Sequence, residues 1–247
     1  AAHYGARPTF IFASATIANP AEHAARLAGV EVEAVEDDSS PRGRKVFALW
    51  NPPDILGREG GEIHRSSNLE TAELVARLLR LGVRTIAFCR SRKAAELVYG
   101  YVQRLLGADE RELAEKVASY RGGYLPRQRR EIERRLFSGE LLAVSTTNAL
   151  ELGVDIGELE ACIMNGYPGT IASTWQQAGR AGRRQGESLA VLVAADDPLD
   201  QYLVRHPEFL FGSPCEEAVV DLENPRILEA HLACAAYELP LREEDEE

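Results

Sequence analysis

Hydrophobic and polar positions in the middle of the chain follow two alternating patterns. Helical patterns cover 69–81, 93–106, 126–138 and 173–181. Short apolar runs between them predict strands at 85–88, 116–120, 141–144, 161–165 and 189–194. Because helices at this spacing supply the crossovers that parallel strands need, the pattern predicts an α/β fold, a parallel sheet with helices on both faces.

The two ends of the chain follow other patterns. Residues 10–13 form an apolar run that predicts a buried strand, and a helix then follows and ends at Gly29. Acids, prolines and glycines alternate over 31–68 around one strand-like segment, 46–50, which indicates a linker with a strand in it. Beyond residue 196 the chain becomes helical and ends in a charged tail. These patterns divide the chain into segments 1–30, 31–68, 69–195 and 196–247.

The composition is that of a globular protein with an uneven distribution of charge. Hydrophobic residues make up 45% of the 247 and charged residues 27%, which argues against bulk disorder. The net charge of −11 comes mostly from acids near 31–38 and at 243–247, whereas 121–135 is rich in arginine. A basic middle is compatible with a phosphate-binding face. Genomic composition bias is the favoured explanation for the many arginines, and the glutamates among them favour a salt-bridged solvent face on 126–138.

Nothing in the sequence indicates a membrane or secreted protein. No apolar run reaches the roughly 18 residues that a membrane helix needs, and the first ten residues lack a signal-peptide layout. The four cysteines, Cys89, Cys162, Cys215 and Cys234, show no CxxC spacing. We therefore expect reduced thiols, a cytoplasmic protein and no metal site.

The most specific chemical signal is Gln176-Gln177-Ala178-Gly179-Arg180-Ala181-Gly182-Arg183. Arginines three apart on a helix share one face, so Arg180 and Arg183 are expected to point into one cleft. Gly179 and Gly182 remove side chains, so that another surface can approach closely. Because a guanidinium is always charged and presents a planar fork, the pair suits the oxygens of a transferring phosphoryl group. The alternative is an exposed basic helix.

A second signal follows the strand predicted at 141–144. Residues 145–157 begin with a cluster of hydroxyls at the carboxyl end of that strand, where open α/β sheets bind ligands. Thr146, Thr147 and the backbone amides of the turn can hold a phosphate. Asp155, which follows Gly153, has room to accept a ribose hydroxyl. By itself the segment is equally consistent with an ordinary polar turn.

Together these strings resemble the second RecA-like domain of superfamily-two nucleic-acid helicases. Residues 176–183 are similar to the QxxGRxGR motif, 147–157 to the motif before it, and Ser14-Ala15-Thr16 to the SAT motif that closes the first RecA-like domain. The order and spacing of all three agree. Further strings at 14–20, 40–43, 175–178 and 209–212 are most similar to the MrfA-like mitomycin-repair DNA helicases of bacteria.

The resemblance implies a domain assignment. Residues 1–30 would end a truncated first RecA-like domain, and 31–68 would be a linker with one strand. Residues 69–195 would form the second RecA-like domain, the helicase C-terminal domain. Residues 196–247 would form a helical extension with an acidic tail.

The resemblance also implies roles for individual residues. Arg183 would be an arginine finger that reaches the γ-phosphate, with Arg180 beside it and Gln176 positioning the nucleotide or the attacking water. Gly153 and Asp155 would contact the ribose of ATP. Contacts to the nucleic-acid backbone would come from Thr146, Thr147, Arg121, Gly122, Ser91 and Arg92, and coupling between the domains from Ser14 and Thr16. Two positions depart from the family pattern: Asn148, where many members carry Asp, and Gln177, where an arginine is often found.

Two elements of a helicase motor are missing from this sequence. There is no GxxxxGK[ST] phosphate loop, and the acidic string at 109–112 has no apolar strand before it, as a DExH box would. We therefore expect ATP with Mg²⁺ to be bound mainly by a first RecA-like domain of the same full-length protein, and this chain alone to hydrolyse no ATP. The expected partner is single-stranded DNA or a duplex with a tail, in DNA repair. The alternatives are a non-catalytic nucleic-acid-binding RecA-like module and a flavodoxin-like nucleotide binder.

Overall fold

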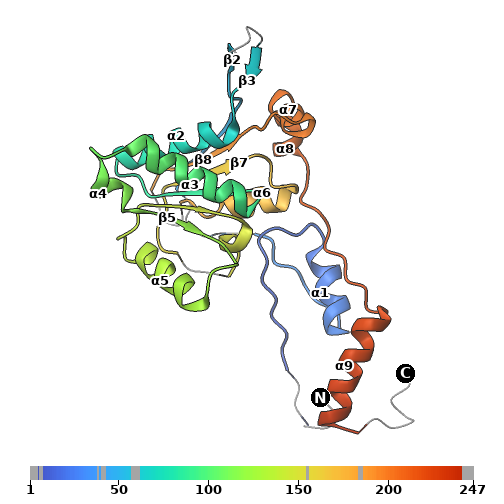
Figure 1. Ribbon diagram of the computed structural model, residues 1–247. Coiled ribbons are helices and arrows are strands. Elements are labelled where there is room, and N and C mark those ends of the chain that lie inside the picture. Colours follow the sequence, from blue (N-terminus) through green and yellow to red (C-terminus); the bar gives the residue numbers. More distant parts are fainter. Residues whose placement is uncertain are drawn as a thin grey trace. The chain divides into compact units, whose positions relative to one another are not determined.

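The computed structural model describes residues 5, 8–37, 39, 43–56, 62–153, 156–182 and 186–240 (Figure 1). The chain forms two compact units. Residues 37–216 make up the larger unit, and residues 1–36 together with 217–247 make up the smaller one.

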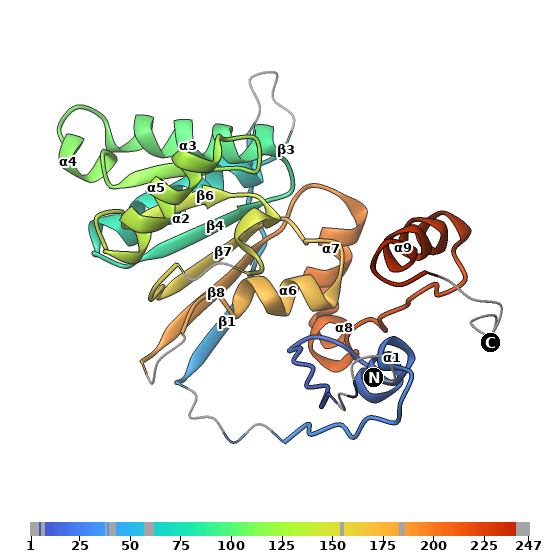
Figure 2. The ribbon, with the colours of Figure 1, turned by 90° about the horizontal axis from the view of Figure 1, so that it is seen from below.

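The larger unit is built on a six-stranded sheet. Its strands, in spatial order, are β1 (Lys45–Trp50), β8 (Ser188–Val193), β7 (Ala161–Asn165), β4 (Thr85–Cys89), β6 (Ala143–Thr146) and β5 (Val117–Tyr120). Every neighbouring pair is parallel, and Figure 2 shows β1, β8, β7 and β4 side by side. The predicted parallel α/β sheet is therefore confirmed.

Helices cover both faces of this sheet. One core contains residues of α2 (Ser67–Arg80), α3 (Arg92–Leu106) and α4 (Arg111–Ala114), and the other contains residues of α5 (Pro126–Phe137), α6 (Ile171–Ala178), α7 (Pro198–Arg205) and α8 (Pro207–Gly212). Successive side chains of β4 point alternately into the two cores. Ile86 and Phe88 pack with α5 and α6, whereas Ala87 and Cys89 pack with α2 and α3. The sheet is consequently buried on both sides, as is usual for parallel sheets.

Side-chain caps begin α3, α6 and α7, which follow β4, β7 and β8. At the start of α3, Ser91 Oγ accepts the N–H of Ala94 at 3.1 Å. Thr170 caps α6 by accepting the N–H of Ser173 at 3.0 Å. Asp197 caps α7 in the same way. These caps satisfy N–H groups that a helix leaves free at its first turn. Each cap also fixes the residue at which the loop after a strand ends and the next helix begins.

Several elements away from the pocket differ from the sequence-based prediction. Residues 10–13 were predicted as a buried strand, but they form no strand and Ile11 is 89% exposed. A strand needs neighbours to complete its hydrogen bonds, and no strand within the described ranges pairs with this segment. The antiparallel hairpin of β2 (Asp54–Leu56) and β3 (Glu62–His64) was not predicted, and neither was α4. These elements are too short to show a period in the sequence.

The smaller unit joins the two ends of the chain. It contains α1 (Pro20–Ala28) and α9 (Pro225–Glu238). Nδ2 of Asn19 donates to the carbonyl of Ala218 at 3.2 Å, and Oδ1 of Asn19 accepts the N–H of Ala218 at 2.9 Å. Arg26 donates to the carbonyl of Val220 at 2.9 Å. Polar contacts to backbone therefore connect the region of α1 with the segment that precedes α9.

In the part of the chain that the structure describes, no helix is both long and apolar enough to cross a membrane.

Candidate functional site

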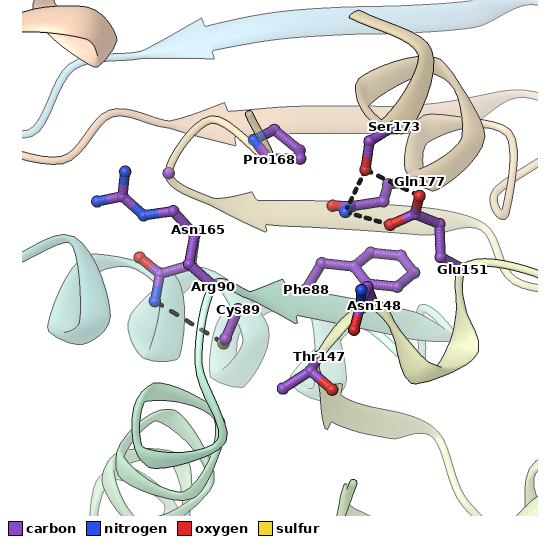
Figure 3. Close-up of a pocket in the computed structure, with 11 residues that line it drawn as sticks. Phe88, Cys89, Arg90, Thr147, Asn148, Glu151, Asn165, Pro168, Ser173 and Gln177 are labelled. Carbon is purple, nitrogen blue, oxygen red and sulfur yellow. Dashed lines mark hydrogen bonds between the residues drawn. The ribbon is translucent and has the colours of Figure 1, made fainter. Parts of the chain in front are cut away.

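A pocket of about 220 Å³ opens at the carboxyl ends of β7, β4 and β6, which are neighbours in the sheet. Cys89 and Asn165 are the last residues of β4 and β7, and Thr147 directly follows β6. The short helix η1 (Asn148–Leu150) and α6 complete the wall (Figure 3). The lining residues are Phe88, Cys89, Arg90, Thr147, Asn148, Glu151, Asn165, Gly166, Pro168, Ser173 and Gln177. Open α/β sheets bind their ligands at this edge, so this pocket is the candidate site.

The strand predicted at 141–144 is observed as β6, Ala143–Thr146, so Ser145 and Thr146 belong to the strand and only Thr147 follows it. The hydroxyls of this string are therefore divided between the pocket and the core. Thr147 and Asn148 line the pocket. Thr146 is fully buried, and its hydroxyl donates to the carbonyl of Thr147 at 3.0 Å. In this structure Thr146 therefore supports the backbone of Thr147, while Thr147 and Asn148 present their side chains to the pocket.

Glu151 connects this turn to α6. Its carboxylate accepts the Ser173 hydroxyl and the Nε2 amide of Gln177, each at 2.8 Å (Figure 3). Nε2 of Gln177 also lies 3.3 Å from the Ser173 hydroxyl. Glu151 and Gln177 are both buried. Sequence reasoning missed the contribution of all three residues to the pocket, although Gln177 and Glu151 lie inside the two strings that it singled out.

The arginine string begins on α6 but extends beyond it. The helix was predicted to run through 181, but α6 ends at Ala178 and Gly179 caps it. Arg180 therefore lies past the helix, so helical spacing does not set the direction of its side chain. Arg180 is buried, and its Nε donates to the carbonyl of Glu151 at 2.8 Å. Gln176 is half-buried on α6.

The backbone conformation and the close packing at position 182 both require a glycine there. Its φ is +79°, a conformation that favours glycine, and a Cβ there would lie 2.3 Å from the Ser188 hydroxyl oxygen. The predicted close approach at this glycine is confirmed. A Cβ at Gly179 would lie 3.0 Å from the carbonyl oxygen of Trp175, which is also tight.

Two of the predicted nucleotide contacts, Arg183 and Asp155, lie outside the described residues. Gly153, predicted beside the ribose, has a left-handed φ of +76°. A side chain at this position would be strained even though the space around it is open.

The predicted backbone-contact residues lie beside the ends of β4 and β5. Ser91 and Arg92, at the start of α3, are exposed, as is Gly122. A Cβ at the neighbouring Gly123 would lie 3.8 Å from Nη1 of Arg92, so the turn after β5 is next to Arg92. The Nε of Arg121 lies 3.2 Å from a carboxylate oxygen of Glu96, and its guanidinium lies 4.9 Å from the centre of the Tyr124 ring. Arg121 is thus held in place by α3 and by its own turn.

Sequence reasoning also missed Arg90, which lines the pocket at the end of β4. Its Nη2 lies 2.9 Å from Asp197 and its Nη1 lies 3.7 Å from Asp200. Burial raises the pKa of Asp200 despite hydrogen bonds from the N–H groups of Ala195 and Tyr167. Burial acts in the same direction on Asp197, but hydrogen bonds from the backbone and from Arg90 outweigh it and lower the pKa of that carboxyl. The fixed charge of Arg90 therefore stands at the pocket rim, between two carboxylates of α7.

The arginine-rich helix α5 carries ion pairs, as its glutamates predicted. Nη2 of Arg134 lies 2.8 Å from Glu131 and 3.2 Å from Glu140, and Nε of Arg135 lies 3.5 Å from Glu140. These groups are largely exposed, which confirms a salt-bridged solvent face for this part of the helix.

The cysteines are free thiols among the described residues. Burial raises the pKa of Cys89 and of Cys162. Within the same ranges, no group of three or more His, Cys, Asp and Glu side chains is arranged to hold a metal ion. Ser14 and Thr16 belong to the smaller unit, where the N–H of Thr16 lies 3.5 Å from the Ser14 hydroxyl.

The motif strings and the fold agree with one family. Residues 70–185 match the helicase conserved C-terminal domain. The chain therefore carries a superfamily-two helicase C-terminal domain. Residues 220–247 match a second family model, the winged helix domain of the ATP-dependent helicase HRQ1. The resemblance derived from the sequence strings is confirmed.

Several known helicases are similar to nearly all of this helicase-domain chain. The ATP-dependent helicase YprA of Bacillus subtilis is 51% identical over 244 residues, which are 98% of this chain and 32% of YprA. The ATP-dependent helicase HRQ1 of Saccharomyces cerevisiae is 44% identical over 240 residues, which are 94% of this chain and 22% of HRQ1. The crystal structure of the DUF1998 helicase MrfA bound to DNA and AMPPNP matches with a TM-score of 0.90 at 50% identity, covering 99% of this chain and 34% of that one. The chain thus spans about a third or less of the length of these relatives.

Proposed function

We propose that this chain is the C-terminal motor lobe of an ATP-dependent DNA helicase that acts in DNA repair in the cytoplasm. The observation that carries the proposal is the pocket at the carboxyl edge of the sheet. Residues of three separate segments line it: Arg90 after β4, three residues after β6 (Thr147, Asn148 and Glu151), and Ser173 and Gln177 on α6. The similarity to MrfA, whose crystal structure holds DNA and AMPPNP, supports the same two ligands here.

In this proposal the chain contributes one side of a cleft between two RecA-like domains. Residues 1–30 end the first domain, 31–68 link the two, 69–195 form the second domain, and 196–247 form the extension. The similarity of 220–247 to a winged helix domain supports assigning the end of this extension to a further domain. Ser14 and Thr16 couple the first domain to DNA binding.

The nucleotide is ATP with Mg²⁺, held mainly by the first RecA-like domain. The donor set of this chain suits phosphate oxygens better than a metal ion, since no three metal-ligating side chains converge within the described ranges. Arg183 acts as the arginine finger, Arg180 stands beside it and Gln176 orients the nucleotide or the attacking water. In phosphoryl transfer an arginine finger is worth about 10³–10⁵ in rate. Gly153 and Asp155 lie against the ribose.

The nucleic-acid partner is single-stranded DNA or a duplex with a single-stranded tail. The residues that contact its backbone are Ser91, Arg92, Arg121, Gly122 and Thr147. The buried hydroxyl of Thr146 supports Thr147 by donating to its carbonyl. The exposure of Ser91, Arg92 and Gly122 supports this assignment. A motor that moves along any sequence has to hold phosphates rather than base edges, and these residue types suit phosphates.

The test uses protein expressed from the complete reading frame and compares wild type with Arg183→Ala. We expect ATP hydrolysis to fall by about three orders of magnitude, while the affinity for a labelled single-stranded oligonucleotide stays within about threefold. If Arg183→Ala instead abolished DNA binding and left hydrolysis unchanged, this chain would be a nucleic-acid-binding module that takes no part in catalysis. We also expect the chain 1–247 alone to hydrolyse no ATP, and DNA-stimulated turnover by this purified chain would overturn that part of the proposal.

A further inference from the structure

Glu151 is a buried acid to which three groups of the neighbouring segment 171–180 are bound. Its two carboxylate oxygens accept the Ser173 hydroxyl and the Gln177 amide, each at 2.8 Å (Figure 3). Its backbone carbonyl accepts Nε of Arg180, also at 2.8 Å. The side chain and the backbone of one residue therefore hold both α6 and the arginine that follows it.

Glu151 is bound just as firmly to the turn that faces the pocket. Its N–H donates to the carbonyl of Asn148 at 2.9 Å and closes the single turn of η1. Asn148 and Thr147 line the pocket beside Glu151. One hydrogen-bonded turn therefore connects Thr147 and Asn148 to Glu151, and the carbonyl of Glu151 connects that turn to Arg180.

Next to the Ser173 hydroxyl and the Gln177 amide, which both donate, position 151 requires a carboxylate. A buried carboxylate loses its hydration, so hydrogen bonds have to replace it. Only a carboxylate accepts at both oxygens at once, whereas the amide of a glutamine offers one acceptor and one donor group. Glu151 uses both oxygens, one for a hydroxyl and one for an amide N–H.

We propose that Glu151 is a positioning residue that couples DNA contact at Thr147 and Asn148 to the placement of Arg180, so that ATP turnover responds to DNA. The inference rests on the proposed function, because it assigns a coupling role within that same site. Although Glu151 lines the pocket, its carboxylate oxygens are taken up by Ser173 and Gln177. It acts through Arg180.

Exchanging the partners tests the proposal. Gln177→Glu sets two buried carboxylates against each other and removes the amide donor. The double variant Glu151→Gln with Gln177→Glu restores one carboxylate, one amide donor and an acceptor for Ser173. Glu131→Gln is the matched control, because it neutralises an exposed glutamate on α5 that pairs with Arg134 and does not line the pocket.

The readout is the ratio of ATP turnover with saturating single-stranded DNA to turnover without DNA, in protein from the complete reading frame. We expect Gln177→Glu to lower this ratio about tenfold, and the double variant to return it to within about threefold of wild type. The Glu131→Gln control should leave the ratio unchanged. A purely structural brace would lower both rates in proportion and leave the ratio as in wild type, and that result would overturn the inference.

A second measurement does not depend on activity. In the chain 1–247, Glu151→Ala should speed hydrogen exchange at the backbone amides of both 147–153 and 171–180. Faster exchange in the first segment alone would overturn the inference, since it would mean that the two segments are not joined through Glu151. Wild-type protein without DNA-stimulated turnover would overturn the proposed function instead, while this exchange measurement would still decide whether Glu151 joins the segments.

Discussion

Gly182→Ala tests whether the backbone after α6 is fixed by packing. Gly182 has φ +79°, and its N–H donates to the carbonyl of Leu159 at 2.9 Å, so the backbone is held in this conformation. An alanine Cβ would lie 2.3 Å from Oγ and 2.7 Å from Cβ of Ser188. Non-bonded heavy atoms do not approach this closely, so either the backbone at position 182 or Ser188, the first residue of β8, has to move.

Two costs add up for this substitution. A non-glycine residue in the left-handed region costs about 1–2 kcal/mol. Overpacking against Ser188 adds about 1–3 kcal/mol. We therefore expect Gly182→Ala to lower the free energy of unfolding by about 2–5 kcal/mol.

A matched substitution separates the two costs. Gly139, which follows α5, has the same φ of +79°, but nothing lies within 4 Å of the place where its Cβ would be. Gly139→Ala therefore reports the backbone cost alone, about 1–2 kcal/mol. Adding Ser188→Gly to Gly182→Ala should recover most of the difference between the two alanine variants, because it removes both atoms of the clash.

The assay is urea unfolding of the chain 1–247 followed by tryptophan fluorescence. The chain has two tryptophans, Trp50 and Trp175, and both lie in the larger unit, so the signal follows the unit that contains Gly182. If Gly182→Ala were no more destabilising than Gly139→Ala, the close packing against Ser188 would be refuted.

Three further predictions concern the core, the thiols and the basic surface. Leu192→Ala, at a fully buried position of β8, should cost about 2–5 kcal/mol in the same urea titration, and a loss within about 0.5 kcal/mol would place this residue outside the core. Near neutral pH, iodoacetamide should label the exposed Cys234 in the folded chain but neither Cys89 nor Cys162. Burial shields these two thiols and raises their pKa, which lowers the fraction present as thiolate. Peptide mass spectrometry that finds either buried thiol labelled before unfolding would contradict this. Arg92→Ala should reduce the salt dependence of single-stranded DNA binding by about 0.7 in the slope of log K against log salt, measured by fluorescence anisotropy, and an unchanged slope would remove Arg92 from the contact surface.

The architecture of the larger unit was largely predictable because its signals are local. The strand predicted at 161–165 is β7 with the same bounds, and the predicted helix at 93–106 differs from α3 by one residue. Apolar periodicity reports which face a segment buries, and that information lies within the segment itself. The glycine predicted to allow close packing, Gly182, is also a local signal, because few other residues adopt its backbone conformation.

The sequence failed where an element depends on a distant neighbour. Residues 10–13 have the composition of a strand, yet no described strand pairs with them. The strand predicted at 46–50 is confirmed as β1, but its place in the main sheet, paired along its full length with β8 over a hundred residues later, was not predicted. Hydrogen bonding between strands is decided by such partners, and no period in the sequence encodes them.

For the candidate site too, some features were predictable from local sequence and others only from the folded chain. Residue types and spacing alone identified two strings that each supply part of the wall of the pocket, and with them the helicase family. Only the tertiary structure decided that Arg180 turns toward the Glu151 carbonyl, that Thr146 supports Thr147 from the core, and that Arg90 stands between two carboxylates of α7. The physical reason is that motif residues are selected by chemistry that the sequence displays, whereas the direction of each side chain is set by burial and by partners that only the folded chain brings within reach.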